Sequence, residues 1–169
     1  MAYLKDERPE TKMVDGEWQV GFYRYKAPML MAEFVAGLKE KKLIGAMCKG
    51  CGKVIVPPRD VCGRCHRKMD ERITVSNWGT ITCFVVSPPV QKGKFTLLGM
   101  DPVVTGLIKE GEVIVPVFVR FDGSDSNVAT ILYEADPKDV YIGMRVQALW
   151  VKQPMGQLSD LEGVVPLGK

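Results

Sequence analysis

The stretch Cys48-Lys49-Gly50-Cys51-Gly52 and its counterpart Cys62-Gly63-Arg64-Cys65-His66 decide how this chain is organised. Each stretch carries two cysteines separated by two residues, and ten residues separate the two pairs. Two such pairs at a short separation are typical of tetrahedral metal sites, because each pair forms a tight turn that aims two thiolates at one point. The sequence therefore predicts one metal site per chain, with the ligands Cys48, Cys51, Cys62 and Cys65.

Zinc in a structural role is the predicted metal, since four protein ligands leave no coordination position for water or substrate. Iron stays as an alternative because a rubredoxin centre uses the same ligand set. A site in which His66 replaces Cys65 is a second alternative. Disulfides are disfavoured, because the charged start Met1–Arg8 lacks the apolar core of a signal peptide and points to a reducing, cytoplasmic location.

The positive charge is concentrated around these cysteines. Residues 48–72 carry seven Lys/Arg against three Asp/Glu, whereas residues 73–169 carry eight against ten. A zinc ion with four thiolates has a formal charge of about −2, so the basic side chains either balance the metal centre or bind phosphate. The whole-chain net charge of +3 is too small to indicate a nucleic-acid partner by itself.

An amphipathic helix is predicted before the cysteines. Trp18, Val20 and Phe22 alternate with other residues and predict a short strand or an arm. An apolar stripe then recurs every four residues over a predicted helix at 29–42; its members are Leu30, Phe34 and Leu38. The short cysteine module that follows is too small to cover this stripe, so we expect the helix to pack on another module or on a partner chain.

From residue 73 onward the pattern changes to strands. Candidate strands lie at 73–77, 80–86, 95–99, 103–109, 113–121, 128–134 and 144–151, with one helical turn at 136–140. This number of short strands over some 80 residues predicts a small closed barrel of the OB type. The fold class is therefore mainly β, with an N-terminal helix, a rubredoxin-like zinc ribbon and a C-terminal OB-fold barrel.

The length of 169 residues fits one domain with a small added module. We predict four segments: an arm and helix at 1–42, the zinc ribbon at 43–72, the barrel at 73–152 and a tail at 153–169. The tail contains Leu158, Leu161 and Val164, which are expected to cover the barrel end or to bind a partner. No apolar run approaches the ~20 residues of a membrane span.

The chain resembles a family of zinc-ribbon/OB-fold proteins that accompany thiolases and related acyl-CoA enzymes. The similarity covers roughly residues 30–152. Its motifs are Phe34-x3-Leu38-x4-Leu43, Cys48-x2-Cys51-Gly52, Pro57-Pro58-Arg59-x2-Cys62-x2-Cys65, Trp78-Gly79-Thr80-Ile81 and Asp136-Pro137-x2-Val140-x-Ile142-Gly143-Met144-x-Val146. The segment 87–128 departs from the compact family pattern.

The resemblance implies a non-catalytic subunit that binds a thiolase-fold catalytic partner and helps to hold or channel the CoA part of an acyl-CoA. Basic side chains in predicted loops are candidate contacts to CoA phosphates; they are Arg59, Arg64, Lys92 and Lys94. Thiolytic cleavage needs a nucleophilic cysteine with acid/base partners. Cys83 is expected to be buried in a strand and His66 to lie beside the metal, so another chain would supply the catalytic residues.

Two other functions compete with this one. Zinc ribbons and OB barrels also bind nucleic acids, and barrels stack bases on aromatic side chains. The predicted barrel is acidic overall, and its aromatic residues are not interleaved with basic ones, which disfavours that alternative. A rubredoxin-like electron carrier would explain the four cysteines but not the barrel.

Overall fold

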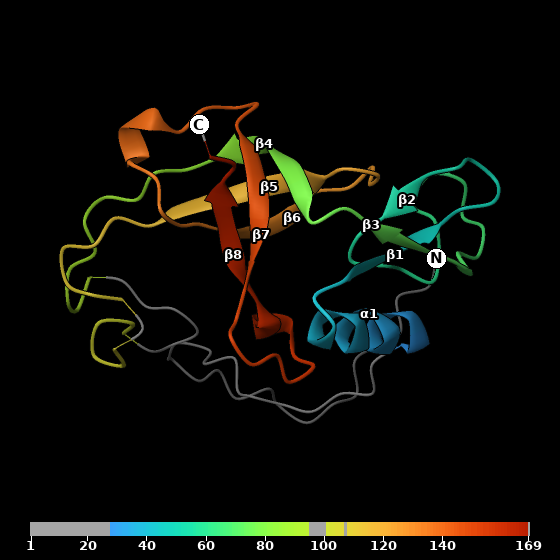
Figure 1. Ribbon diagram of the computed structural model, residues 1–169, viewed down its shortest axis with the longest axis horizontal. Coiled ribbons are helices and arrows are strands. Elements are labelled where there is room, and N and C mark those ends of the chain that lie inside the picture. Colours follow the sequence, from blue (N-terminus) through green and yellow to red (C-terminus); the bar gives the residue numbers. More distant parts are fainter. Residues whose placement is uncertain (1–27, 95–100, 107, 169) are drawn as a thin grey trace, which may run out of the picture.

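The computed structural model describes residues 28–94, 101–106 and 108–168, which form one α-helix, two short 3-10 helices (η1 and η2), a three-stranded sheet and a five-stranded barrel (Figure 1). The elements in chain order are α1 (Met29–Lys39), β1 (Leu43–Met47), β2 (Val54–Ile55), β3 (Glu71–Val75), β4 (Trp78–Phe84), β5 (Val115–Phe121), β6 (Val128–Leu132), η1 (Pro137–Asp139), β7 (Arg145–Trp150), η2 (Leu158–Asp160) and β8 (Leu161–Pro166). The predicted class, mainly β with one helix, a four-cysteine ribbon and a barrel, is confirmed.

Helix α1 begins directly after Pro28 and ends three residues earlier than predicted. The backbone of Lys41 has a φ of 57°, a left-handed conformation that continues no helix. The N–H groups of Glu40 and Lys42 both donate to the carbonyl of Gly37, which closes the last turn. The chain then enters β1 at once.

The apolar stripe of α1 is buried inside this chain. Leu30, Phe34 and Leu38 are 5%, 3% and 1% exposed. Phe34 and Leu38 join the same core cluster as the barrel residues, while Leu30 packs near the cysteines. Of the two expected alternatives, packing on another module is therefore confirmed and binding of the stripe to a partner chain is wrong, because the ribbon and barrel together cover it.

The ribbon sheet has the order β2-β1-β3, with both pairings antiparallel. Figure 1 shows α1 alongside this sheet, at one end of the molecule, with the barrel at the other. Arg72 of β3 binds Glu33 of α1: its Nε and Nη2 donate to the two carboxylate oxygens at 2.7 and 2.9 Å. The helix and the ribbon thus form one packed unit.

The barrel closes in the order β4-β5-β6-β8-β7, with β7 paired back to β4. Strand β5 alternates strictly between buried and exposed residues, as a barrel strand with one inward face should. If the five barrel strands are numbered 1 to 5 along the chain, their order around the barrel is 1-2-3-5-4. This is the Greek-key arrangement of an OB-type barrel.

The segment predicted as a tail supplies the strand that closes the barrel. Strand β8 pairs antiparallel with β7 and parallel with β6, where Val164 lies opposite Leu132. Val164 is fully buried in the barrel core. The expectation that this tail merely covers the barrel or binds a partner is wrong, because the barrel needs it as its fifth strand.

The close approach of β8 to β6 depends on Gly163. A Cβ at this position would lie 2.5 Å from the ring of Tyr133 and 2.6 Å from the carbonyl oxygen of Ile131. Only a residue without a side chain fits at such distances. Gly163 therefore allows β8 to approach the strand beside it.

The long connection between β4 and β5 differs from the predicted strands. Residues 103–106, part of a predicted strand at 103–109, form turns. The carboxylate of Asp101 accepts the N–H groups of Val103 and Val104, at 2.8 and 3.3 Å, and this bends the backbone out of an extended conformation. The predicted strand at 95–99 and the predicted arm at 18–22 lie outside the described residues.

One hydrophobic core runs through all three parts of the structure. It joins Phe34 and Leu38 of the helix to Leu43 and Val56 of the ribbon and to the barrel interior. The barrel contributes Ile81, Val115, Val117, Val119, Phe121, Val128, Leu132, Val146, Ala148 and Val164. The ribbon therefore packs on the barrel through shared apolar side chains as well as through the chain connection.

Candidate metal centre

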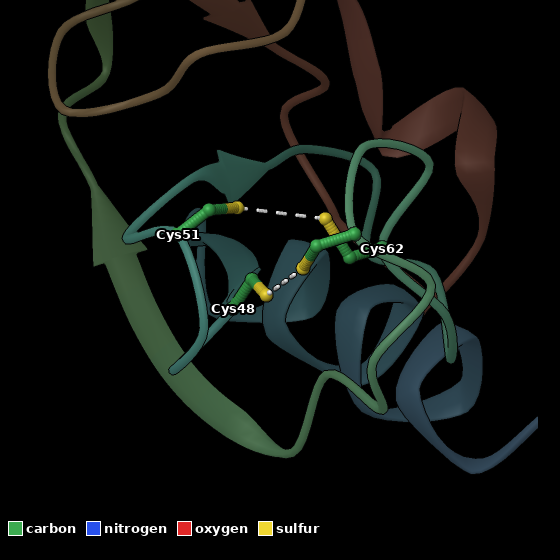
Figure 2. A group of neighbouring side chains, drawn as sticks. Cys48, Cys51 and Cys62 are labelled. Atoms are coloured by element: carbon green, nitrogen blue, oxygen red, sulfur yellow. Dashed lines mark hydrogen bonds between the residues drawn. The ribbon is translucent and has the colours of Figure 1, made fainter.

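The four predicted ligand cysteines meet at one point of the ribbon. Their sulfur atoms all lie within 4.8 Å of one another. Cys48 Sγ lies 3.3 Å from Cys65 Sγ, and Cys51 Sγ lies 3.7 Å from Cys62 Sγ. Figure 2 shows Cys48 and Cys51 of the first turn beside Cys62 of the second. Zinc–sulfur bonds of about 2.3 Å in a tetrahedron place the sulfur atoms roughly 3.8 Å apart. The space between the four sulfur atoms therefore fits one zinc ion.

The two turns that carry the cysteines repeat the same backbone pattern. The N–H of Gly52 donates to the carbonyl of Cys48 at 2.7 Å, and the N–H of His66 donates to the carbonyl of Cys62 at 2.9 Å. Both donors have a positive φ, 70° at Gly52 and 58° at His66. The second turn thus places a histidine in a conformation that glycine adopts more readily.

His66 is outside the cluster of metal-ligating atoms, which consists of the four cysteines. Its position after Cys65 matches that of Gly52 after Cys51, so its role is to complete the turn. The alternative in which His66 replaces Cys65 is therefore not supported.

Crowding of the four sulfurs opposes the ionisation of all of them at once. The pKa of Cys62 is lowered to about 6, chiefly because the backbone N–H groups of Cys65 and Arg64 donate to its sulfur. At Cys65 the N–H of Arg67 favours the thiolate, but the sulfur of Cys48 and burial outweigh it and raise the pKa to about 11. A bound cation is what allows four adjacent thiolates to coexist.

The centre is closed to solvent on one side. Cys48 and Cys62 are 0% and 2% exposed, and Cys51 and Cys65 are half-buried. Leu30 of α1 and Met69 pack beside them in a small separate core. Four thiolates with an apolar backing define a structural site for one zinc ion, because every coordination position is filled by the protein.

The structure divides the four basic residues predicted to contact CoA phosphates into two places. Arg59 and Arg64 line the same pocket beside the second turn, whereas Lys94 lines a different pocket with the segment Ser87–Gln91 and Ile114. Lys92 is exposed directly after that segment, near the carboxylate of Asp101. The structure thus brings the two arginines together and leaves the two lysines elsewhere.

Cys83 is exposed, so the expectation of a buried strand cysteine is wrong. The register of β4 shifts between Ile81 and Cys83, and this irregularity pairs Cys83 with the outward-facing Phe118 of β5. Ile81, on the inward face, is fully buried instead. A strict alternation read from the sequence cannot show such a shift.

Side chains that no local sequence pattern indicates join the ribbon to the barrel; they belong to Lys53, Asp125 and Ser126. Lys53 donates to one carboxylate oxygen of Asp125, and the N–H of Val54 donates to the other at 2.9 Å. The N–H of Val56 donates to Ser126 Oγ at 2.7 Å, and that hydroxyl donates to the carbonyl of Val56 at 2.8 Å. Residues 122–127 have the Asp, Gly, Ser and Asn composition of an exposed loop, but such Asp and Ser side chains are also suited to bind a neighbouring backbone.

A match to a known family covers the metal centre. Residues 35–70 match the family described as ChsH2, rubredoxin-like zinc ribbon domain. A DUF35 domain-containing scaffold protein from Methanocaldococcus jannaschii is 28% identical over 109 residues, which is 64% of this chain and 67% of that protein. Within the part of the chain that the structure describes, no helix is long and apolar enough to cross a membrane.

Two solved structures share the fold. A protein of unknown function from the DUF35 family of Sulfolobus solfataricus aligns with a TM-score of 0.54 at 17% identity, over 79% of this chain and 81% of that chain. A structure named Ltp2-ChsH2(DUF35) aldolase aligns with a TM-score of 0.53 at 18% identity, over 85% and 98%. The fold and the four-cysteine centre therefore define a zinc-ribbon/OB-fold protein. Its ribbon, residues 35–70, matches the ChsH2 zinc-ribbon family, and the chain is similar to a DUF35 domain-containing protein.

Proposed function

We propose that this chain is a non-catalytic accessory subunit of a thiolase-type acyl-CoA enzyme complex. The observation that carries the proposal is the closed metal centre in a DUF35 fold: four cysteines fill the zinc site and leave no position for a substrate. The relative from Methanocaldococcus jannaschii is described as a scaffold protein, and one structural neighbour is described as an aldolase that includes a DUF35 chain. The first description supports a non-catalytic role, and the second supports a role beside an enzyme.

Neither Cys83 nor His66 supports catalysis by this chain alone. Cys83 faces outward from the barrel beside Phe118, and His66 holds the second turn of the ribbon. A thiolase nucleophile needs a base within hydrogen-bond reach, and the ribbon histidine is on a different unit of the structure. The partner enzyme would therefore supply the nucleophile and the acid/base groups.

We propose that the complex acts on an acyl-CoA and that this chain helps to bind or channel it, with benzoylsuccinyl-CoA thiolase of anaerobic toluene degradation as the specific candidate. The zinc ion has a structural role in this scheme.

The test is reconstitution with a thiolase-fold catalytic subunit. We expect the isolated chain to show no thiolase activity, that is, no coenzyme A-dependent cleavage of the carbon–carbon bond of a 3-oxoacyl-CoA, and the complex to show it. Cys83→Ala should leave the activity of the complex within a few-fold of the unchanged complex. Failure of a thiolase-fold subunit to bind the chain, or loss of activity by orders of magnitude in Cys83→Ala with the complex intact, would contradict the proposal.

A further inference from the structure

A pocket of about 330 Å³ lies where the second cysteine turn of the ribbon faces the loop between β5 and β6. We call it the junction pocket; its lining includes Arg59, Arg64, Lys53, Ile55, Val61 and Ser126. Its size is ordinary for a small-ligand site. Because its walls come from both the ribbon and the barrel loop, the pocket exists only when the two units are packed together.

The junction pocket has an excess of positive charge. Arg59 and Arg64 are exposed on its wall, and no carboxylate among the described residues forms an ion pair with either guanidinium. The one carboxylate in the lining, Asp125, is already occupied by Lys53 and by the N–H of Val54. Two guanidinium groups are therefore available to a ligand, and their planar sets of donors suit phosphate oxygens.

The wall also has an apolar part. Ile55 is half-buried, and Val61 is 52% exposed although it is a large apolar residue. Gly63 lies in the same lining with nothing within 4 Å of the position that a Cβ would take, so the backbone there is open to a ligand. Such a surface suits a flat or apolar group attached to the phosphate.

We propose that the junction pocket binds the phosphate-bearing end of a nucleotide, with Arg59 and Arg64 contacting the phosphate and Val61 contacting the nucleoside. This inference rests on the proposed function, because the ligand that a CoA-handling subunit would offer to such a pocket is the phosphorylated adenosine of CoA. It also separates the four basic residues predicted from the sequence: Arg59 and Arg64 bind the phosphate, whereas Lys92 and Lys94 do not.

The competing role for the arginines is to balance the negative charge of the zinc–thiolate centre. The two roles differ in what the arginine variants lose. If the guanidinium groups serve the metal, Arg59→Ala and Arg64→Ala will lower the zinc content. If they serve a ligand, the zinc content and the melting temperature will stay unchanged while ligand affinity falls.

The experiment is calorimetric titration of the zinc-loaded full chain with adenosine 3′,5′-bisphosphate and, separately, with inorganic pyrophosphate. Each of Arg59→Ala and Arg64→Ala should weaken binding of the bisphosphate about tenfold, the effect of one charge-assisted contact. Arg67→Ala, a ribbon arginine outside the pocket lining, and Lys94→Ala are the matched controls and should bind normally. No binding at millimolar concentration, equal affinity in all four variants, or zinc loss in the pocket variants would overturn the inference.

A second arm tests the nucleoside. Val61→Ser should weaken binding of the bisphosphate but not of pyrophosphate, because only the former carries a base and a sugar. Equal affinity of the unchanged chain for both probes would overturn the nucleotide assignment.

Failure of the pocket inference and failure of the proposed function give different experimental results. Binding of the bisphosphate by a chain that forms no complex with a thiolase-fold enzyme would support the pocket and contradict the proposed function. A complex that assembles and works normally with both arginines replaced would contradict the pocket alone. If the arginine variants bind the probe normally but fail to assemble, the arginines contact protein and the pocket inference is wrong.

Discussion

The hydroxyl of Ser126 forms hydrogen bonds with both the N–H and the carbonyl of Val56. Its Oγ accepts the Val56 N–H at 2.7 Å and donates to the Val56 carbonyl at 2.8 Å. Val56 directly follows the edge strand β2, and the Ser126 side chain forms the two hydrogen bonds that a neighbouring strand would otherwise form there. The loop of the barrel is in this way bonded to the ribbon, 70 residues away in sequence.

Ser126→Ala should lower the free energy of unfolding by about 1–3 kcal/mol, because it leaves a buried backbone N–H without a partner. Chemical denaturation of the zinc-loaded chain measures this change. Ser124→Ala is the matched control, since that hydroxyl donates only to the carbonyl of Ser126 within the same loop. An equal effect of the two variants would show that the junction does not depend on the bond to Val56.

Removal of zinc should unfold the ribbon and destabilise the barrel as well. Structural zinc contributes its binding free energy to folding, and the ribbon shares one core with the barrel. Cys48→Ser should abolish stoichiometric zinc binding and the amide-exchange protection of residues 43–72. Cys83→Ser should do neither, since Cys83 is outside the cluster. Ribbon amides that remain protected in metal-free protein would contradict this prediction.

His66→Gly should stabilise the zinc-loaded chain by about 1 kcal/mol, because the positive φ at this position strains a residue with a side chain. The reciprocal variant Gly52→Ala should destabilise by about 1 kcal/mol, since a Cβ there meets nothing within 4 Å and the backbone conformation alone is affected. Thermal unfolding at fixed zinc concentration measures both. Loss of zinc from His66→Gly would show instead that the histidine is a ligand.

Gly163→Ala should destabilise the barrel by about 1–3 kcal/mol, the range for overpacking. The added methyl group would collide with the Tyr133 ring and with a backbone carbonyl, which cannot move aside cheaply. Gly168→Ala is the control, because nothing lies within 4 Å of its Cβ position. Similar denaturation midpoints for the two variants would indicate that β8 does not require this close approach.

Asp160 should make the stability of the loop beside α1 dependent on pH. Burial alone would raise its pKa, but the N–H groups of Met155, Gln157 and Gly156 outweigh burial, and the pKa is lowered. A lowered pKa in the folded state means that the stabilisation is present above the unfolded value of about 4 and is lost as pH falls further.

Asp160→Asn should remove this dependence between about pH 5 and pH 2 while it lowers stability at pH 7. Denaturation across that range measures the difference between the two proteins. Parallel pH profiles would show that another carboxylate is responsible. Asp136→Asn is a control, because Asp136 caps an exposed turn with one N–H, that of Lys138.

The metal ligands could be predicted from the sequence because their spacing is local: two short turns specify all four cysteines. The helix could also be predicted, but not what covers it, because Phe34 and Leu38 pack against residues far along the chain. The fifth barrel strand was missed for the same reason, since Leu161–Pro166 is a short stretch interrupted by Gly163 that becomes a strand only between β6 and β7. The bond between Ser126 and Val56 depends likewise on a contact between distant segments.

The position of β8 has a consequence during protein synthesis. A ribosome makes the chain from the N-terminus, so β6 and β7 exist before the strand that lies between them. Until residues 161–166 emerge, both strands have an unpaired edge with free N–H and C=O groups, which are available to the edges of other nascent chains. The zinc ribbon, whose ligands end at Cys65, can be complete well before that moment. Partner chains or chaperones present during translation would then meet a finished ribbon joined to an open barrel.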